Sequence, residues 1–219
     1  MKKLPHGMAP VALVLVPLVL MHCSCAPTAW MVATFWPPKD VPAQYRPPPG
    51  KKILVFVDDM LHPVSYEPIK GELSRRLGEQ LVQHKIAAEI VAYERLADLV
   101  AATPNFNLLP VSEVGQKLGA DIVLYVQVDK FALKDASTDE LWRGEFQVTV
   151  RMVDVLKGRL WPKGSRAGHL VPAVTTPPST ESSETYADQL TRILAAKTAD
   201  RVAKLFYKHK APHEGAWQK

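Results

Sequence analysis

The spacing of apolar residues changes several times between residues 52 and 208, and each change predicts a different element. Residues 53–57 are continuously apolar (Ile-Leu-Val-Phe-Val), which is typical of a strand buried on both faces. Residues 67–84 carry Ile69, Leu73, Leu77 and Leu81 at helical spacing, which predicts an amphipathic helix. Residues 142–152 alternate between apolar or small and polar positions, as in a half-buried strand paired antiparallel with the strand before it.

Weaker signals fill the sequence between these segments. They predict strands at 88–92 and 121–133, helices at 94–102 and 110–118, a short edge strand at 168–174 and a final helix from Ser182 or Ser183 to about Lys208. The order is β-α-β-α-α-β-β-(β)-α. We therefore expect one domain of the α/β (mixed α+β) class, whose mixed sheet is parallel where helices connect strands and antiparallel in a hairpin at one side.

The first 25 residues have the order of an export signal. Lys2 and Lys3 precede an uncharged, mostly apolar run from Met8 to Met21, and Cys23-Ser24-Cys25 follows. A transmembrane helix needs about 20 apolar residues, and this run is shorter and interrupted by prolines. We expect a lipoprotein-type signal peptide over residues 1–25; conventional cleavage and retention as an anchor remain alternatives.

The two cysteines compete as the lipidation site. Lipoprotein signals resemble one another in a leucine three places before the cysteine and a small residue just before it. Cys25 follows Ser24 but has His22 at the third place, whereas Cys23 has Leu20 at the third place but follows His22. We favour Cys25 as the lipidated residue, with Cys23 as the alternative.

The region after the cysteines is rich in proline. The second part of residues 26–51 has prolines at 37, 38, 42, 47, 48 and 49, which favour extended polyproline conformations. We expect a membrane-proximal tether over 26–51, the αβ domain over 52–208 and a basic C-terminal tail over 209–219.

The charge of +5 over 219 residues is concentrated at the two ends of the chain. Residues 53–196 carry more acids than bases and lack a basic stripe interleaved with aromatic side chains, so we expect no nucleic-acid partner. The residue after either cysteine (Ser24 or Ala26) is not the aspartate that retains lipoproteins in an inner membrane. The predicted location is the outer membrane, facing the periplasm.

Asp58 and Asp59 are the best catalytic candidates, because parallel sheets bind ligands at the carboxyl ends of their strands. A metal-dependent enzyme using these residues, with or without Asp129, is one alternative. The other interpretation is that the two acids cap the loop after the strand. No phosphate loop or nucleophile elbow is present in the sequence, and we predict no catalytic residues, metal ligands or cofactor.

Several segments resemble exported αβ domains of bacterial envelope lipoproteins. They are the signal and tether, the first strand, Leu118-Gly119-Ala120-Asp121 before the strand at 122, and Val150 to Asp154 ahead of Gly158 and Trp161. The chain is similar to the curli secretion lipoprotein CsgG, to penicillin-binding-protein activator lipoproteins and to the amino-terminal domain of TolB. The resemblance covers residues 52–208, implies a fold and no catalytic residues, and fits an uncharacterised lipoprotein family.

These observations lead to a main hypothesis and two alternatives. The main one is a non-enzymatic envelope protein, held at the membrane by its N-terminal lipid, that binds another envelope protein. The alternatives are the metal-dependent enzyme and a structural subunit that self-associates through its sheet edge.

Overall fold

The computed structural model describes residues 39–135, 141–181 and 183–211. The chain divides into two compact units, one from Pro42 to His209 and the other formed by the two ends. β1 and β8 form a small two-stranded sheet, and the remaining strands form a six-stranded sheet. The elements are β1 Asp40–Val41, β2 Lys52–Asp58, α3 Pro68–Gln83, β3 Glu89–Val91, α4 Tyr93–Ala102, the 3-10 helix η2 Phe106–Leu108, α5 Val111–Lys117, β4 Ile122–Lys134, β5 Trp142–Asp154, β6 Gly158–Trp161, β7 His169–Thr175, α6 Glu184–Ala203 and β8 His209–Lys210.

The large sheet has the order β3-β2-β4-β5-β6, and β7 also pairs with β5. β2 runs parallel to both β3 and β4, and Asp58 at its end lies opposite Gln127. β4 and β5 form a long antiparallel hairpin, and β6 and β7 pair with β5 in turn. The expected mixed α/β (α+β) fold, with its antiparallel hairpin at one side, is confirmed.

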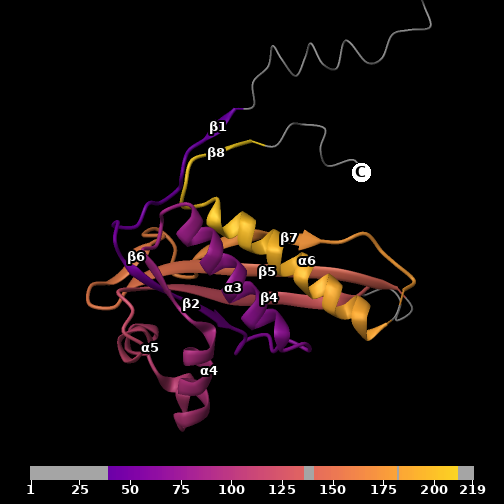
Figure 1. Ribbon diagram of the computed structural model, residues 1–219, viewed down its shortest axis with the longest axis horizontal. Coiled ribbons are helices and arrows are strands. Elements are labelled where there is room, and N and C mark those ends of the chain that lie inside the picture. Colours follow the sequence, from indigo (N-terminus) through magenta and orange to yellow (C-terminus); the bar gives the residue numbers. More distant parts are fainter. Residues whose placement is uncertain (1–38, 136–140, 182, 212–219) are drawn as a thin grey trace, which may run out of the picture. The chain divides into compact units, whose positions relative to one another are not determined.

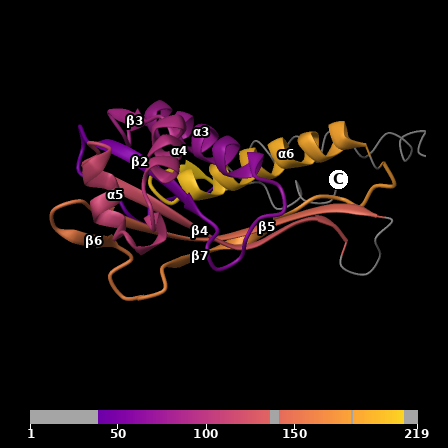
Figure 2. The same cartoon turned by 90° about the horizontal axis from the view of Figure 1, so that it is seen from below.

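One face of this sheet carries the larger core. Figures 1 and 2 show α3 and α6 lying side by side over this face. Alternate strand residues such as Val55, Leu124 and Phe146 point into this core, where they meet Leu73 of α3 and Leu194 of α6. All five side chains are buried because the apolar positions of strands and helices face one another.

The opposite face is covered over a smaller area. Leu54 and Val123 point to it and pack with Leu96 of α4, with Val114 of α5 and with Leu118, which directly follows α5. Further along the hairpin, polar residues of β4 and β5 occupy this face. The alternation seen in β5 is thus the pattern of a hairpin with one apolar and one polar face.

The last helix ends earlier than its sequence predicts. α6 begins after Ser183, whose hydroxyl accepts a hydrogen bond from the Tyr186 amide (3.1 Å), but it ends at Ala203 instead of about Lys208. The Leu205 carbonyl accepts hydrogen bonds from the amides of Gln44 and Tyr45 (2.8 and 3.2 Å), so this stretch bonds to the N-terminal segment.

Residues 42–51, whose composition is that of a tether, belong to the larger compact unit. Tyr45 stacks with Trp161, their ring centroids 6.4 Å apart, and Trp161 in turn meets Phe206 edge to face. These aromatic contacts attach the proline-rich segment to the end of the αβ domain.

Candidate functional site

The two acids that end β2 point to different partners. Asp58 accepts hydrogen bonds from the Met60 amide (3.1 Å) and from the Tyr125 hydroxyl. Asp59 accepts one from the Val64 amide (3.1 Å) and pairs with Lys70 Nζ at 3.1 Å. Both carboxylates thus fix the loop after β2, as in the loop-capping interpretation of the sequence.

Asp58 belongs to a row of polar contacts on the less covered face of the sheet. The Arg151 guanidinium lies over the Tyr125 ring, 4.3 Å from its centroid. Farther along the hairpin, Asp129 accepts a hydrogen bond from the Thr149 hydroxyl (2.7 Å). Asp129 therefore lies on the same face as Asp58 but is held by a different partner.

Tyr125 in this row is held as a neutral phenol. Burial, followed by the hydrogen bond and charge of Asp58, raises the pKa of Tyr125 to about 12. The phenol is therefore protonated at neutral pH and acts as a hydrogen-bond donor. Within the described ranges, no group of three or more His, Cys, Asp or Glu residues is placed to hold a metal ion.

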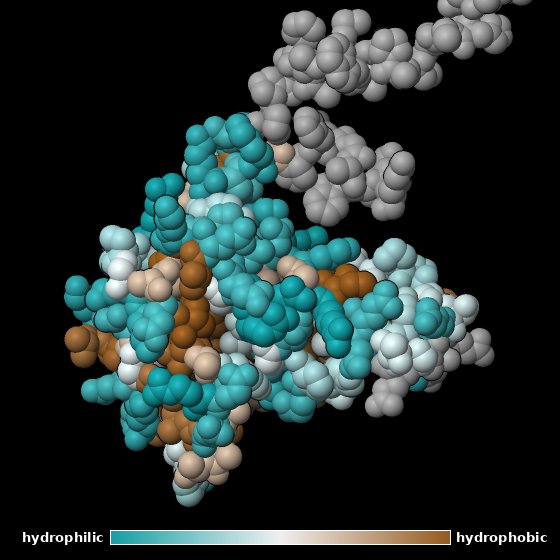
Figure 3. Space-filling model, in the orientation of Figure 1, coloured by the Kyte–Doolittle hydropathy of each residue, from teal (hydrophilic) through white to brown (hydrophobic). Residues whose placement is uncertain are grey.

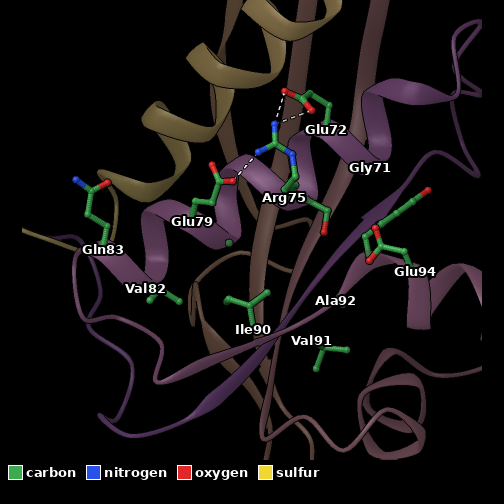
Figure 4. A pocket seen from close by; sticks show the side chains of 13 residues that line it. Gly71, Glu72, Arg75, Glu79, Val82, Gln83, Ile90, Val91, Ala92 and Glu94 are labelled. Carbon is green, nitrogen blue, oxygen red and sulfur yellow. Dashed lines mark hydrogen bonds and ion pairs between the residues drawn. The ribbon is translucent and has the colours of Figure 1, made fainter.

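A groove between α3 and β3 offers a different kind of surface. It has a volume of about 760 Å³ and is lined mainly by α3, by Ile90 and Val91 of β3, and by the first residues of α4. Figure 4 shows Arg75, Glu79 and Val82 on the α3 side and Ile90 on the β3 side. Figure 3 shows a strip of hydrophobic surface beside α3, with hydrophilic side chains around it.

Small residues form the α3 wall of this groove. Gly71, Ser74 and Gly78 lie three and four residues apart and so share one flank of the helix. A Cβ on Gly78 would lie 3.0 Å from Ile90 Cγ2, and one on Gly71 would lie 3.1 Å from the Tyr93 ring. The two glycines thus let α3 approach β3 and the start of α4 closely.

Charged side chains form the outer part of the groove. Arg75 donates to Glu72 (2.8 and 2.9 Å) and to Glu79 (2.5 Å), so its charge is already shared between two carboxylates. Glu72 also accepts from Arg76 at 2.9 Å. Within the part of the chain that the structure describes, no cation pairs with Glu94, which is exposed in the first turn of α4.

Sequence reasoning missed this groove. The glycines at 71 and 78 are a usable signal, because glycine inside a helix costs about 1 kcal/mol relative to alanine and so points to a close approach. The signal is incomplete, since it does not name Ile90 and Tyr93 as the groups approached. Only the fold brings these residues to the same flank of α3.

The lipidation candidates Cys25 and Cys23 lie outside the described residues, as does the signal peptide. Among the described helices, none combines the length and the apolar character needed to cross a bilayer. The assignments of the signal, the tether and the lipidated cysteine therefore stay predictions.

No known family and no curated protein matches the sequence. Several solved structures are similar in fold. PelC from Paraburkholderia phytofirmans, solved as a dodecamer, is 16% identical, with 77% of this chain and 96% of that chain covered and a TM-score of 0.39. Lipoprotein GNA1162 from Neisseria meningitidis is 16% identical, with 68% and 99% covered and a TM-score of 0.38.

TolB from Acinetobacter baumannii is a further similar structure, at 12% identity, with 76% of this chain and 30% of that chain covered and a TM-score of 0.30. At such identities and TM-scores these likenesses do not bear on function. A likeness to TolB and to envelope lipoproteins was expected from the sequence. The resemblance to CsgG and to penicillin-binding-protein activators stays a prediction.

Proposed function

We propose that this chain is a non-enzymatic, membrane-anchored protein of the cell envelope whose αβ domain binds another protein through the α3–β3 groove. The observation that carries the proposal is the contrast between that open groove and the fully engaged acids at the end of β2. A groove with apolar walls at a sheet edge suits a protein partner.

The positions of the strand-end acids support a binding role over a catalytic one. A metal site needs carboxylates that converge on one ion, but Asp58 and Asp59 bond in different directions. Their hydrogen bonds go to backbone amides and to side chains of the domain itself. This arrangement gives no support to the metal-dependent enzyme.

The N-terminal sequence supports the membrane anchor. Lipid on Cys25 places the domain next to a membrane, with the outer membrane and the periplasm as the proposed location. Intact mass of the protein extracted from membranes tests this: we expect residues 1–24 to be absent and Cys25 to carry lipid. Cys25→Ser should release the protein from the membrane, and Cys23→Ser should not. Release by Cys23→Ser alone would move the anchor to Cys23, and an unmodified N-terminus would reject lipidation.

Photo-crosslinking from a single position tests the binding role. Val82 faces the groove and is 46% exposed, whereas Val100 on α4 is 44% exposed and lies outside the groove lining. A photo-reactive residue at position 82 of the full-length membrane protein should capture one partner, and the same residue at position 100 should not. The purified partner should then bind the wild-type protein and lose affinity for Glu94→Lys. Equal capture from both positions, or undiminished binding by the variant, would contradict the proposal.

A further inference from the structure

The groove lies beside a strand with an unpaired side. In the described part of the chain, β3 ends the six-stranded sheet and pairs only with β2, from Lys52 opposite Glu89 to Leu54 opposite Val91. Such an edge presents backbone groups to which an extended segment can bond. An added strand would continue the sheet past β3 and lie along the groove.

The dimensions of the groove suit a short strand. Its α3 wall extends from Gly71 to Gln83, which is about 18 Å at 1.5 Å per residue. About five residues of extended chain at about 3.3 Å each cover that length. Because strand side chains alternate, two or three of them would point into the groove, whose lining includes Ile90 and the half-exposed Val82.

The charges of the groove define the chemistry of the segment. Its lining holds three glutamates (Glu72, Glu79 and Glu94) and one arginine, Arg75. Arg75 is bound to Glu72 and Glu79, which leaves Glu94 to meet a cation from outside the chain. A segment that alternates apolar residues with lysine or arginine complements both the apolar wall and this acidic margin.

The same charges argue against a second copy of this chain as the occupant. A twofold contact through the β3 edges sets the groove of one copy against the groove of the other. Two linings that each hold three glutamates and one arginine would then face one another, and like charges disfavour such a contact.

On the basis of the proposed protein-binding function, we propose that the groove accepts an extended protein segment of alternating apolar and basic residues. The segment adds as a strand to the free edge of β3. Its apolar side chains enter the groove over Ile90 and Val82, and a basic side chain pairs with Glu94.

Synthetic peptides test the inference on the full-length protein in detergent. The probe is an end-capped octapeptide of alternating valine and lysine. The comparison peptides are the valine–glutamate equivalent and a valine–lysine peptide with a central proline, which cannot complete the added strand. We expect the first to bind at least tenfold more tightly than either other peptide and to slow hydrogen exchange of the β3 amides. Equal binding of the three peptides would overturn the inference.

Two variants locate the peptide. Gly78→Leu displaces Ile90 from the lining of the groove, since even a Cβ at this position would lie 3.0 Å from Ile90 Cγ2, and it should abolish binding. Glu94→Lys is a surface change that leaves the fold intact and should weaken binding by about tenfold, corresponding to 1.4 kcal/mol. Glu113→Lys is the matched control, because Glu113 lies in the first turn of α5 as Glu94 does in α4, and it should change binding by less than twofold. If Glu94→Lys and Glu113→Lys lost peptide affinity equally, the loss would come from the net charge of the protein and not from a contact at Glu94. This result would contradict the inference.

Sedimentation of the full-length protein tests the other possible occupant of the groove, a second copy of this chain. If the full-length protein dimerises and Gly78→Leu abolishes the dimer, a second copy fills the groove and the inference is wrong. If peptides fail to bind while position 82 still captures a partner, strand addition is wrong and the proposed function stands. If the peptides fail to bind and position 82 captures no partner, the inference and the proposed function are both wrong.

Discussion

The acids at the carboxyl end of β2 have partners within the domain, whereas the side chains at the β3 edge of the sheet line an open groove. At the end of β2, Asp58 and Asp59 each accept a backbone amide and a side-chain donor. At the edge, apolar groups line an open groove, and within the described ranges no cation forms an ion pair with Glu94. Conspicuous acids can thus fix a loop, whereas inconspicuous glycines let a helix lie close to a short edge strand.

On this basis, changes at the end of β2 should lower the free energy of unfolding and leave binding unchanged. Changes in the groove should weaken binding and leave the free energy of unfolding nearly unchanged. Variants at the two places test that division.

Tyr125→Phe should have the largest effect, at alkaline pH. Burial and Asp58 raise the pKa of Tyr125 to about 12, against about 10 in an unfolded chain. The stability that comes from this neutral phenol is therefore present below pH 10 and is lost between about pH 10 and pH 12. The loss is on the order of 2–3 kcal/mol. Urea unfolding across this range should show a shallower decline for the phenylalanine variant. Identical slopes would contradict the assignment.

Asp59→Ala should lower the free energy of unfolding by about 2 kcal/mol at pH 7, because it leaves the Val64 amide and the poorly exposed Lys70 without this acceptor. Glu67→Gln is the matched control, since Glu67 pairs with the same lysine but its side chain is 70% exposed. The control should cost under about 0.5 kcal/mol. Urea titrations measure both. If the folded Asp59→Ala protein captured less of the partner, the end of β2 would take part in binding, contrary to this division.

Gly78→Ala should alter binding more than stability. The new methyl group lies 3.0 Å from Ile90 Cγ2, and this crowding offsets the gain of about 1 kcal/mol in helix propensity. We expect the free energy of unfolding to stay within about 1 kcal/mol of wild type. Affinity for the partner captured from position 82 should fall several-fold. Calorimetry on the purified pair measures it, and unchanged affinity would exclude this flank of α3 from the interface.

Val82→Ala and Val100→Ala should have the smallest effects. Both valines are exposed to a similar degree, so neither change should alter stability by more than about 0.5 kcal/mol. Only Val82→Ala should weaken binding of the partner, by a few-fold, because only Val82 lines the groove. Parallel titrations of the two variants with the partner test this. An equal change in affinity would show that the groove is not the binding surface.

Much of the fold followed from local pattern. The run at 53–57, the helical spacing of Leu73, Leu77 and Leu81, and the alternation before Met152 each reflect a face that must be buried. The end of α6 did not follow, because it depends on a bond between the Leu205 carbonyl and residues about 160 positions earlier in the chain. Local spacing carries no record of such a distant partner.

The candidate site was less accessible to sequence reasoning. Asp58 and Asp59 were found because acids after a buried strand are visible in a linear pattern. Their partners Tyr125 and Lys70 come from different elements, and these contacts hold the acids in the loop after β2. The groove needs α3 to lie against the short strand β3, a close approach that the glycines permit but do not specify.

Hydrogen exchange of the full-length protein, with and without the partner captured from position 82, locates the binding surface. If the partner binds at the α3–β3 groove, exchange of the amides of Glu89, Ile90 and Val91 in β3 slows, and the loop from Met60 to Val64 is unchanged. Slower exchange in that loop, with β3 unchanged, would contradict it and return the site to the carboxyl end of β2.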